Sequence, residues 1–335
     1  MSNSNTNGHV NGNAPPAPPA PPAPPAPPAR VPGLFHDLVE VRETATMGLG
    51  LFAKQEISRG TVFSFDTAML VIVKDQQQEE VNMEDLYIFI SKVLDASDAD
   101  LAQLDALSMS DTLAIQREDV LRLLREEFHI NANDGDELVD QIAVRWMKHQ
   151  TNSVIIQTGT GRGHGVYPNF SRINHSCIPN AATATDHGQG LLAVYTTHDV
   201  LAGEQLFVNY GPGFFAPAEV RRSRYLWYGF FCSCAGCINH DLDRVRQQLP
   251  LAFQNMAACL NTGNPQGATL HAQRMETLMV DTGLLGPQIL YVYDGIRDAF
   301  AHAHYAHEAM GWEMAKASVV EDLLSKWSHY GIFEI

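Results

Sequence analysis

The sequence lacks long hydrophobic runs and an excess of basic residues. No window approaches the roughly 20 apolar residues that a membrane-spanning helix needs. The N-terminus, MSNSNTNGHVNGNAPP, is polar and does not resemble a signal peptide. Lys and Arg number 22 against 38 Asp and Glu, which gives a net charge of -16 at pH 7. Because neutralising phosphates needs basic side chains, this balance argues against direct nucleic-acid binding. It favours neutral or basic partners, including lysine-rich peptides.

Cysteine is also scarce, with 5 residues in the chain. Without a signal peptide or a membrane segment, we expect an intracellular protein whose cysteines stay reduced. We therefore interpret them as metal ligands or buried thiols before disulfides. Cys259, in FQNMAACLNTG, falls on the apolar face of an expected helix and is most simply a core thiol.

Residues 1–33 have almost no apolar side chains beyond alanine and proline, and they include PPAPPAPPAPPAPPA. Such a segment cannot form a packed core, so we expect a disordered, extended tail that acts as a spacer. Docking of this tail on a proline-reader domain is the alternative.

The rest of the chain predicts an α+β fold. LVEVRETA and TVFSFDTAMLVIVK are typical of strands, and short strands return in NSVIIQT, GLLAVYTTHDV and EQLFVNYG. Between these groups, residues 74–150 form a helical insertion with three amphipathic segments. The C-terminal region, 239–335, is expected to hold stacked helical hairpins. Its helices are predicted near 242–261, 265–282, 286–309 and 311–329.

A cluster of three cysteines, CSCAGC, is the strongest chemical signal in the sequence. Cys232, Cys234 and Cys237 can converge on one tetrahedral Zn²⁺ but leave its fourth position unfilled. Cys177, on the tight turn INHSCIPN, is our first choice for the fourth ligand, and spacing alone leaves His240 as a rival.

Three other features are interpreted as structural rather than catalytic or ligand-binding. The glycines of TGTGRGHG do not have dinucleotide-binding spacing, so we expect a flexible hairpin loop at 158–165. The histidines of AHAHYAHEAM are expected on the surface or in a groove of one helix, where His304 and His307 share a face. Tyr210, at a strand end, reads by itself as a core aromatic residue.

Four motifs in order resemble a known family. GLGLFA, INHSCIPNA, GEQLFVNYG and CSCAGC are similar to the motifs of SET-domain protein lysine methyltransferases. HGVYPNFSRINHSC, NSVII and EVRRSRYLWYGFFCSC more closely resemble the SMYD (SET-and-MYND) branch and related fungal SET proteins. The resemblance implies a mostly β SET fold with knot-like threading over 34–238, followed by TPR-like hairpins.

The resemblance also implies a cofactor, S-adenosylmethionine, and a lysine ε-amine of a protein, such as a histone, as methyl acceptor in the nucleus or cytoplasm. Tyr210 matches the catalytic tyrosine, and Tyr228 matches an aromatic wall of the lysine channel. The predicted cofactor-binding residues are Gly48, Leu49, Gly50, Asn152, Asn174, His175, Tyr210 and Phe230. The predicted ligands of one structural Zn²⁺ per chain are Cys177, Cys232, Cys234 and Cys237.

The chain departs from the branch in two places. Residues 74–150 contain no cysteine, so the MYND zinc module is absent and the helical insertion takes its place. Gln205 stands where an acidic residue is usual, and we expect it at a tolerant surface position. Two other functions stay open on the sequence: a catalytically weak SET scaffold, and an N-methyltransferase that acts on a small amine.

Overall fold

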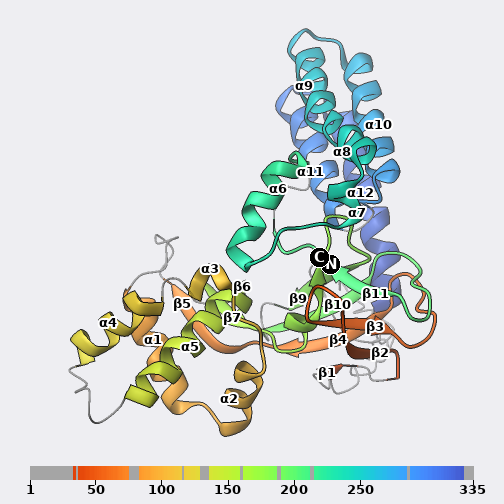
Figure 1. The fold of residues 1–335 in the computed structure, drawn as a ribbon. Helices are drawn as coiled ribbons and strands as arrows, with labels where there is room; N and C mark the ends of the chain where they lie inside the picture. The colour runs from red at the N-terminus through yellow and green to blue at the C-terminus, as the bar shows by residue number, and fades with distance from the viewer. Residues whose placement is uncertain are drawn as a thin grey trace, which may run out of the picture.

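A computed structural model describes most of the chain beyond the proline-rich segment. The described ranges are 33–34, 37–74, 83–114, 117–128, 136–158, 161–186, 190–211, 215–284 and 287–327. Residues 1–32, which hold nearly all of the predicted tail, lie outside them. The described chain is an α+β protein, as the sequence predicts. Small sheets form its middle, one group of helices stands at one side, and a second group rises above (Figure 1).

Two four-stranded sheets form the body of the protein. The first has the order β1-β4-β10-β9, and its strands are Gly33–Leu34, Val62–Thr67, Leu191–Thr196 and Ala181–Asp186. The second has the order β2-β3-β11-β8, and its strands are Val39–Glu43, Leu49–Ala53, Gln205–Val208 and Asn174–His175. In this second sheet β8 runs parallel to β11. The INHSCIPN turn therefore begins beside the strand that leads to Tyr210.

The two sheets share one hydrophobic core. Along β10, Leu192 and Val194 point into the cluster that also holds Leu51 and Leu206 of the second sheet. The alternate residues of β10, such as Ala193, pack in a smaller cluster on the other face. Side chains of a strand point alternately to its two faces, so an all-apolar run such as LLAV is typical of a strand buried on both sides.

The third sheet corrects one expectation. Its order is β5-β7-β6, with strands Met69–Lys74, Gly161–Val166 and Ser153–Thr158. Residues 161–165 of TGTGRGHG are therefore in a strand and are not a flexible loop, while residues 159 and 160 lie outside the described ranges. A Cβ built on Gly163 would collide with the backbone of Ile72. Glycine permits this close approach of two strands, but it leaves no alternating side-chain pattern in the sequence.

The helical insertion packs against the third sheet. Its helices are α1 to α5, at Met83–Asp95, Asp98–Asp105, Asp111–Ala114, Arg117–Phe128 and Asp136–Asn152. The three amphipathic segments of the sequence correspond to α1, α4 and α5. Helices α2 and α3 were not predicted; α2 starts where the Ser97 side chain accepts a hydrogen bond from the Asp100 amide. The insertion and the sheet share a core that includes Leu70, Val166 and Trp146.

The C-terminal helices have a core of their own. Helix α6, Ala218–Tyr225, continues into the 3₁₀ turn η2, Leu226–Tyr228. Helices α7 to α12 follow at Ala235–Ile238, His240–Arg246, Gln248–Asn261, Pro265–Asp281, Pro287–His302 and Ala306–Trp327. Helices α9 to α12 surround buried residues such as Met256, Met279 and Phe300. The single helix expected over 286–309 is wrong. It breaks at residues 303–305, where His304 has φ +66°, so His304 and His307 do not share a helix.

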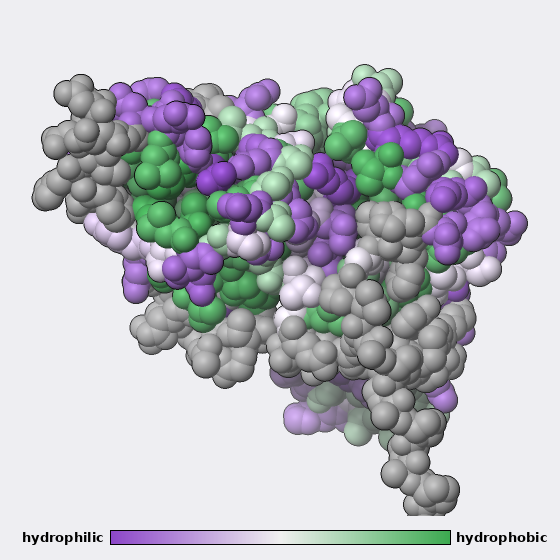
Figure 2. Space-filling view, turned by 90° about the horizontal axis from the view of Figure 1, so that it is seen from below, coloured by the Kyte–Doolittle hydropathy of each residue, from purple (hydrophilic) through white to green (hydrophobic). Residues whose placement is uncertain are grey.

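The exterior is mixed in character. Seen from below, apolar residues gather at the side that α1–α5 occupy in Figure 1, and hydrophilic residues interrupt them across the rest of this face (Figure 2). A membrane-spanning segment is not found among the helices of the described ranges.

Candidate functional site

The turn that opens the site is anchored by a buried carboxylate. Asp66, on β4, accepts hydrogen bonds from the backbone amides of Asn169 (2.7 Å) and Phe170 (2.9 Å). Phe170 begins the 3₁₀ turn η1, Phe170–Arg172, which leads into β8. Burial raises the pKa of Asp66 to about 6, although these two amides oppose the rise. Asp66 therefore positions the chain just before Asn174, although burial disfavours the charged form of its carboxyl group.

The four predicted zinc ligands converge. The Sγ atoms of Cys177, Cys232, Cys234 and Cys237 all lie within 4.8 Å of one another. Cys177 Sγ is 4.0 Å from Cys232 Sγ and 3.5 Å from Cys237 Sγ. A tetrahedral zinc with bonds of about 2.3 Å needs sulfurs about 3.8 Å apart. The cysteines are not disulfide-bonded, and the group does not include the exposed His240. The donor set therefore fits a closed, four-thiolate zinc site.

Hydrogen-bonding groups lie against two of the four sulfurs. The Cys177 amide donates to Cys234 Sγ at 3.3 Å. His175 Nδ1 accepts a hydrogen bond from the Tyr210 amide at 3.2 Å, and burial lowers the pKa of His175 to about 4. A neutral ring that accepts at Nδ1 carries its proton on Nε2, and Nε2 lies 3.3 Å from Cys177 Sγ. The His175 ring thus joins the sulfur cluster to Tyr210.

The His175 ring makes its contacts within the protein. Both ring nitrogens have partners within the protein, so a contact with a cofactor would come from the His175 backbone. The ring is also enclosed by aromatic neighbours. Its centroid lies 3.9 Å from Tyr225, 5.3 Å from Tyr210 and 5.9 Å from Phe230.

Tyr225 is a member of the site that the sequence analysis missed. It is the last residue of α6, its side chain is buried, and its ring stacks on Phe230 with centroids 5.6 Å apart and an angle of 7° between planes. Its hydroxyl donates to Asn209 Oδ1 at 3.3 Å. The available signal was the spacing of Tyr225 and Tyr228, which are three apart and so share a face of a helical segment.

The two predicted catalytic tyrosines lie side by side. The ring centroids of Tyr210 and Tyr228 are 5.2 Å apart. The Tyr210 hydroxyl donates to the Ile173 carbonyl at 2.7 Å, and the Tyr228 hydroxyl donates to the Tyr210 carbonyl at 3.3 Å. Burial raises the pKa of both phenols above the ordinary value near 10, and for Tyr210 the neighbouring Tyr228 adds to the effect. Both groups are therefore neutral hydrogen-bonding groups at physiological pH rather than bases.

The GLG segment lies against Asn174. The Asn174 amide nitrogen donates to the Leu49 carbonyl at 2.9 Å. A Cβ on Gly48, which has φ +66°, would meet no heavy atom within 4 Å, and the Leu49 side chain is 42% exposed. An accessible strip of backbone thus runs beside Asn174, as a cofactor lying along Gly48 and Leu49 requires. These residues fit the cofactor that the resemblance implies.

Gln205 is not at the surface position that we expected. Its side chain packs on Gly50, where any Cβ would overlap its Nε2 atom. That Nε2 atom is buried and has no hydrogen-bond acceptor, and the same holds for Nδ2 of Asn209. Gly50 therefore lies closely against the ends of the Gln205 and Asn174 side chains. The two buried amide donors belong to Gln205, on β11, and to Asn209, which directly follows β11.

Asn152 makes its side-chain hydrogen bonds within the insertion. It ends α5, and its amide nitrogen donates to the carbonyls of Ser108 (2.8 Å) and Lys148 (2.7 Å), both in the insertion. Its proposed contact with a cofactor thus rests on the resemblance alone.

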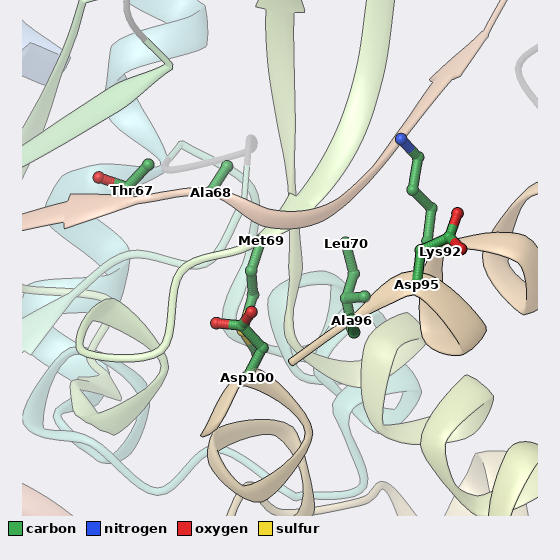
Figure 3. A pocket seen from close by; sticks show the side chains of 8 residues that line it. All are labelled: Thr67, Ala68, Met69, Leu70, Lys92, Asp95, Ala96 and Asp100. Carbon is green, nitrogen blue, oxygen red and sulfur yellow. The ribbon is translucent and has the colours of Figure 1, made fainter. Parts of the chain in front are cut away.

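An open pocket of about 370 Å³ lies elsewhere, between the β4–β5 junction and helices α1 and α2 (Figure 3). Its walls include Met69, Leu70, Lys92, Asp95 and Asp100. None of the predicted site residues lines it, so it is separate from the tyrosine and cysteine groups.

Comparison with known proteins agrees with this geometry. Residues 48–211 match the SET domain family. A SET domain-containing protein of Acanthamoeba polyphaga mimivirus is 29% identical over 103 residues, which are 30% of this chain and 38% of that protein. Human histone-lysine N-methyltransferase SMYD3 is 33% identical over 81 residues, 24% of this chain and 18% of that protein. Histone-lysine N-methyltransferase SET5 of Meyerozyma guilliermondii is 39% identical over 81 residues, 23% and 17% of the two chains.

The matched segments span well under half of the length of these relatives. The family match covers the GLG segment, Asn174, Cys177 and Tyr210, whereas Tyr228 and the other three cysteines follow it in the chain. The chain thus has a segment that matches the SET domain family, and it resembles the SMYD methyltransferases.

Proposed function

We propose that this protein is an S-adenosylmethionine-dependent protein-lysine N-methyltransferase. The observation that carries the proposal is the pair Tyr210 and Tyr228, two neutral phenols in ring contact. The Tyr210 hydroxyl is bonded to the carbonyl of Ile173, directly before Asn174, which in turn contacts the GLG backbone. We further propose the division into a SET domain with its cysteine cluster at 34–238 and a helical region at 239–335.

Each group has a defined task in this proposal. Asn174 and the backbone of Gly48 to Gly50 hold the cofactor, and Phe230 packs against it. When bound, S-adenosylmethionine supplies an electrophilic methyl group. Tyr210 and Tyr228 enclose the acceptor amine in an aromatic channel, which disfavours the charged form of lysine and orients the amine. Positioning of this kind supplies much of the catalysis of a transfer between two bound groups. Tyr210 acts as an orienting hydrogen-bonding group because its raised pKa excludes it as a base.

A structural zinc completes the proposed site. Four thiolates fill its coordination sphere, so it has no open position for chemistry. Its task is to hold the segment that carries Tyr228 and Phe230 against the turn that carries Asn174 and His175.

The proposed substrate is a protein with an accessible lysine, such as a histone tail or another basic peptide. The net charge of -16 favours basic partners, and the similar proteins SMYD3 and SET5 are named histone-lysine methyltransferases. By the same similarity we propose action in the nucleus or cytoplasm. The proline-rich tail is a candidate ligand for a proline-reader domain.

The test is methyl transfer from labelled S-adenosylmethionine to an array of lysine peptides. The wild-type chain should methylate a subset of basic peptides. Tyr210→Phe should lower transfer by about 100-fold or more, since it removes an orienting hydroxyl at the reacting centre, while cofactor binding measured by calorimetry stays within a few-fold.

Tyr291→Phe is the matched control, because this tyrosine is exposed on α11, and it should leave transfer unchanged. A wild-type chain that binds the cofactor but transfers no methyl group to any peptide would contradict the proposal and support a scaffold role. Transfer by Tyr210→Phe at the wild-type rate would overturn the role given to this residue.

A further inference from the structure

Two buried arginines flank the cysteine cluster. Arg221 on α6 and Arg246 on α8 have side chains that are 1% and 0% exposed. Arg221 Nη2 donates to the Gly236 carbonyl at 2.6 Å and lies 3.6 Å from Cys237 Sγ. Arg246 Nη2 donates to the Cys177 carbonyl at 3.1 Å. The cluster is thus contacted by one guanidinium group from α6, which precedes the CSCAGC segment, and by another from α8, which follows it.

The two arginines share the one carboxylate near them unequally. Arg221 forms an ion pair with Asp243 at 2.9 Å. Arg246 has no carboxylate partner among the ion pairs of the described chain, and its Nε and Nη1 atoms are buried without an acceptor. A guanidinium cannot lose its proton in a protein, and an uncompensated buried charge costs several kcal/mol. The surrounding structure must therefore supply negative charge.

The cysteine cluster is the source of that charge. Four thiolates and one Zn²⁺ carry a net charge of -2, and the surroundings of the cluster carry two arginines and one aspartate. We propose that Arg246 is a charge-compensating residue of the zinc site. Its guanidinium stabilises the metal–thiolate cluster and couples zinc binding to the docking of helix α8. The inference rests on the metal site proposed above and is independent of methyl transfer.

The coupling is structural as well as electrostatic. Arg246 is the last residue of α8, the helix that leads into the C-terminal core, and its partner Cys177 lies 69 residues earlier. With zinc present, the cluster satisfies the guanidinium and holds α8 in place. With zinc absent, the nearby carboxylate of Asp243 still acts on Arg246, but it is already paired with Arg221, so the docked helix is less favoured.

The test compares Arg246→Met with Arg244→Met in the full-length, reduced chain. Arg244 is on the same helix but its side chain is 75% exposed and pairs with Asp241, so it is a matched loss of one positive charge. Zinc affinity is measured by competition with 4-(2-pyridylazo)resorcinol. We expect Arg246→Met to raise the apparent dissociation constant for zinc at least tenfold, and Arg244→Met to change it less than twofold.

A second measurement separates charge compensation from packing. Arg246→Met should lower the unfolding midpoint of the zinc-loaded protein but leave that of the metal-free protein equal or higher, because the unbalanced cation is gone. A residue that only packs would cost the same in both forms. Arg246→Lys, which keeps the charge, should recover most of the zinc affinity.

Several outcomes overturn the inference. They are a wild-type chain that binds no zinc, an Arg246→Met affinity within twofold of wild type, equal loss of stability with and without zinc, and an Arg246→Lys variant as weak as Arg246→Met. None of these readouts depends on methyl transfer, so failure of the proposed enzyme activity is distinguishable from failure of this inference.

Discussion

His175 connects the two halves of the site through one imidazole ring. Its Nδ1 atom accepts from the Tyr210 amide, and its Nε2 atom faces Cys177 Sγ. A shift of the sulfur cluster therefore changes the backbone position of the proposed catalytic tyrosine. His175 is therefore a positioning residue that acts through Tyr210. In the INHSC motif, the histidine and the cysteine two positions later are in direct contact.

Asp66 predicts a distinct pH dependence of stability. Its folded-state pKa of about 6 lies above the ordinary value of 3.8 because the carboxyl is buried. The native state thus binds more protons than the unfolded state between these values, so this contribution to stability is fully present below about pH 4 and is lost as the pH rises through about 6. The full effect corresponds to about 3 kcal/mol at most.

Asp66→Asn removes this titration and keeps an oxygen that accepts from the Phe170 amide. The free energy of unfolding of the variant minus that of wild type should increase from pH 4.5 to pH 7, as measured by urea denaturation with equal zinc loading. His149, whose pKa burial lowers to about 4, titrates in the opposite sense in both proteins and cancels in this difference. A difference that is constant with pH would falsify the role assigned to Asp66.

At the scale of elements, the insertion holds the turn that carries Tyr228. The Ser110 hydroxyl donates to the Trp227 carbonyl at 2.8 Å, and the Thr112 hydroxyl donates to the Leu226 carbonyl at 2.7 Å. Ser110 is in turn held by Thr151, near the end of α5. The helical insertion therefore contributes directly to the position of η2.

Gly229 makes this contact sensitive to one methyl group. It ends η2 with φ +82°, and a Cβ would lie 2.9 Å from Ser110 Oγ and 3.0 Å from the Asp111 amide. Gly229→Ala should destabilise the protein by about 3 kcal/mol, from the left-handed backbone and the clash together. It should also lower methyl transfer by displacing Tyr228.

Gly203→Ala is the matched control for this substitution. Gly203 has φ +83°, but its Cβ would meet nothing within 4 Å, so only the backbone strain of about 1 kcal/mol applies and methyl transfer should persist. Thermal unfolding and the peptide assay measure both effects. Equal losses in the two variants would show that the contact between the insertion and η2 has no energetic role.

At the scale of the whole molecule, the cysteine cluster is the junction between the sheets and the C-terminal helices. Ile178, next to Cys177, fills the space beside both Gly236 and Gly283, where a Cβ would lie 2.7 and 2.9 Å from its side chain. Helices α9 to α12 have a separate hydrophobic core. Loss of the metal should therefore loosen the junction without unfolding that core.

This arrangement predicts the effect of metal removal. The wild-type chain should contain about one zinc, which Cys177→Ser should lose. Chelation or this substitution should lower amide-exchange protection in α6 to α8 by about tenfold or more, while α9 to α12 keep theirs. Cys259→Ser is the control, because this thiol packs in the C-terminal core away from the cluster. Zinc retained in Cys177→Ser, or protection lost evenly across all helices, would contradict the junction.

Local hydrophobic patterns predicted most of the helices and strands correctly. The errors arose where the structure depends on contacts between residues far apart in the sequence or on one residue's backbone conformation. The amphipathic segments that became α1, α4 and α5 are visible in the sequence because one helix face must be apolar. The strand at 161–165 is not visible, since its glycines are selected for backbone approach to Ile72 rather than for side-chain burial. The break at His304 depends on a single left-handed residue between two helices, which helical periodicity does not reveal.

The sequence by itself determined the α+β class, the SET motifs and the three-cysteine cluster CSCAGC, because short spacings and hydrophobic periods are properties of contiguous residues. Only the tertiary structure decided that His175 braces Tyr210, that Tyr225 joins the aromatic group, that Gln205 is packed on Gly50, and that Arg246 faces the cluster. Each of these depends on segments far apart in the chain that meet in a buried space. There an unpaired donor or charge is costly, so the identity of each partner matters.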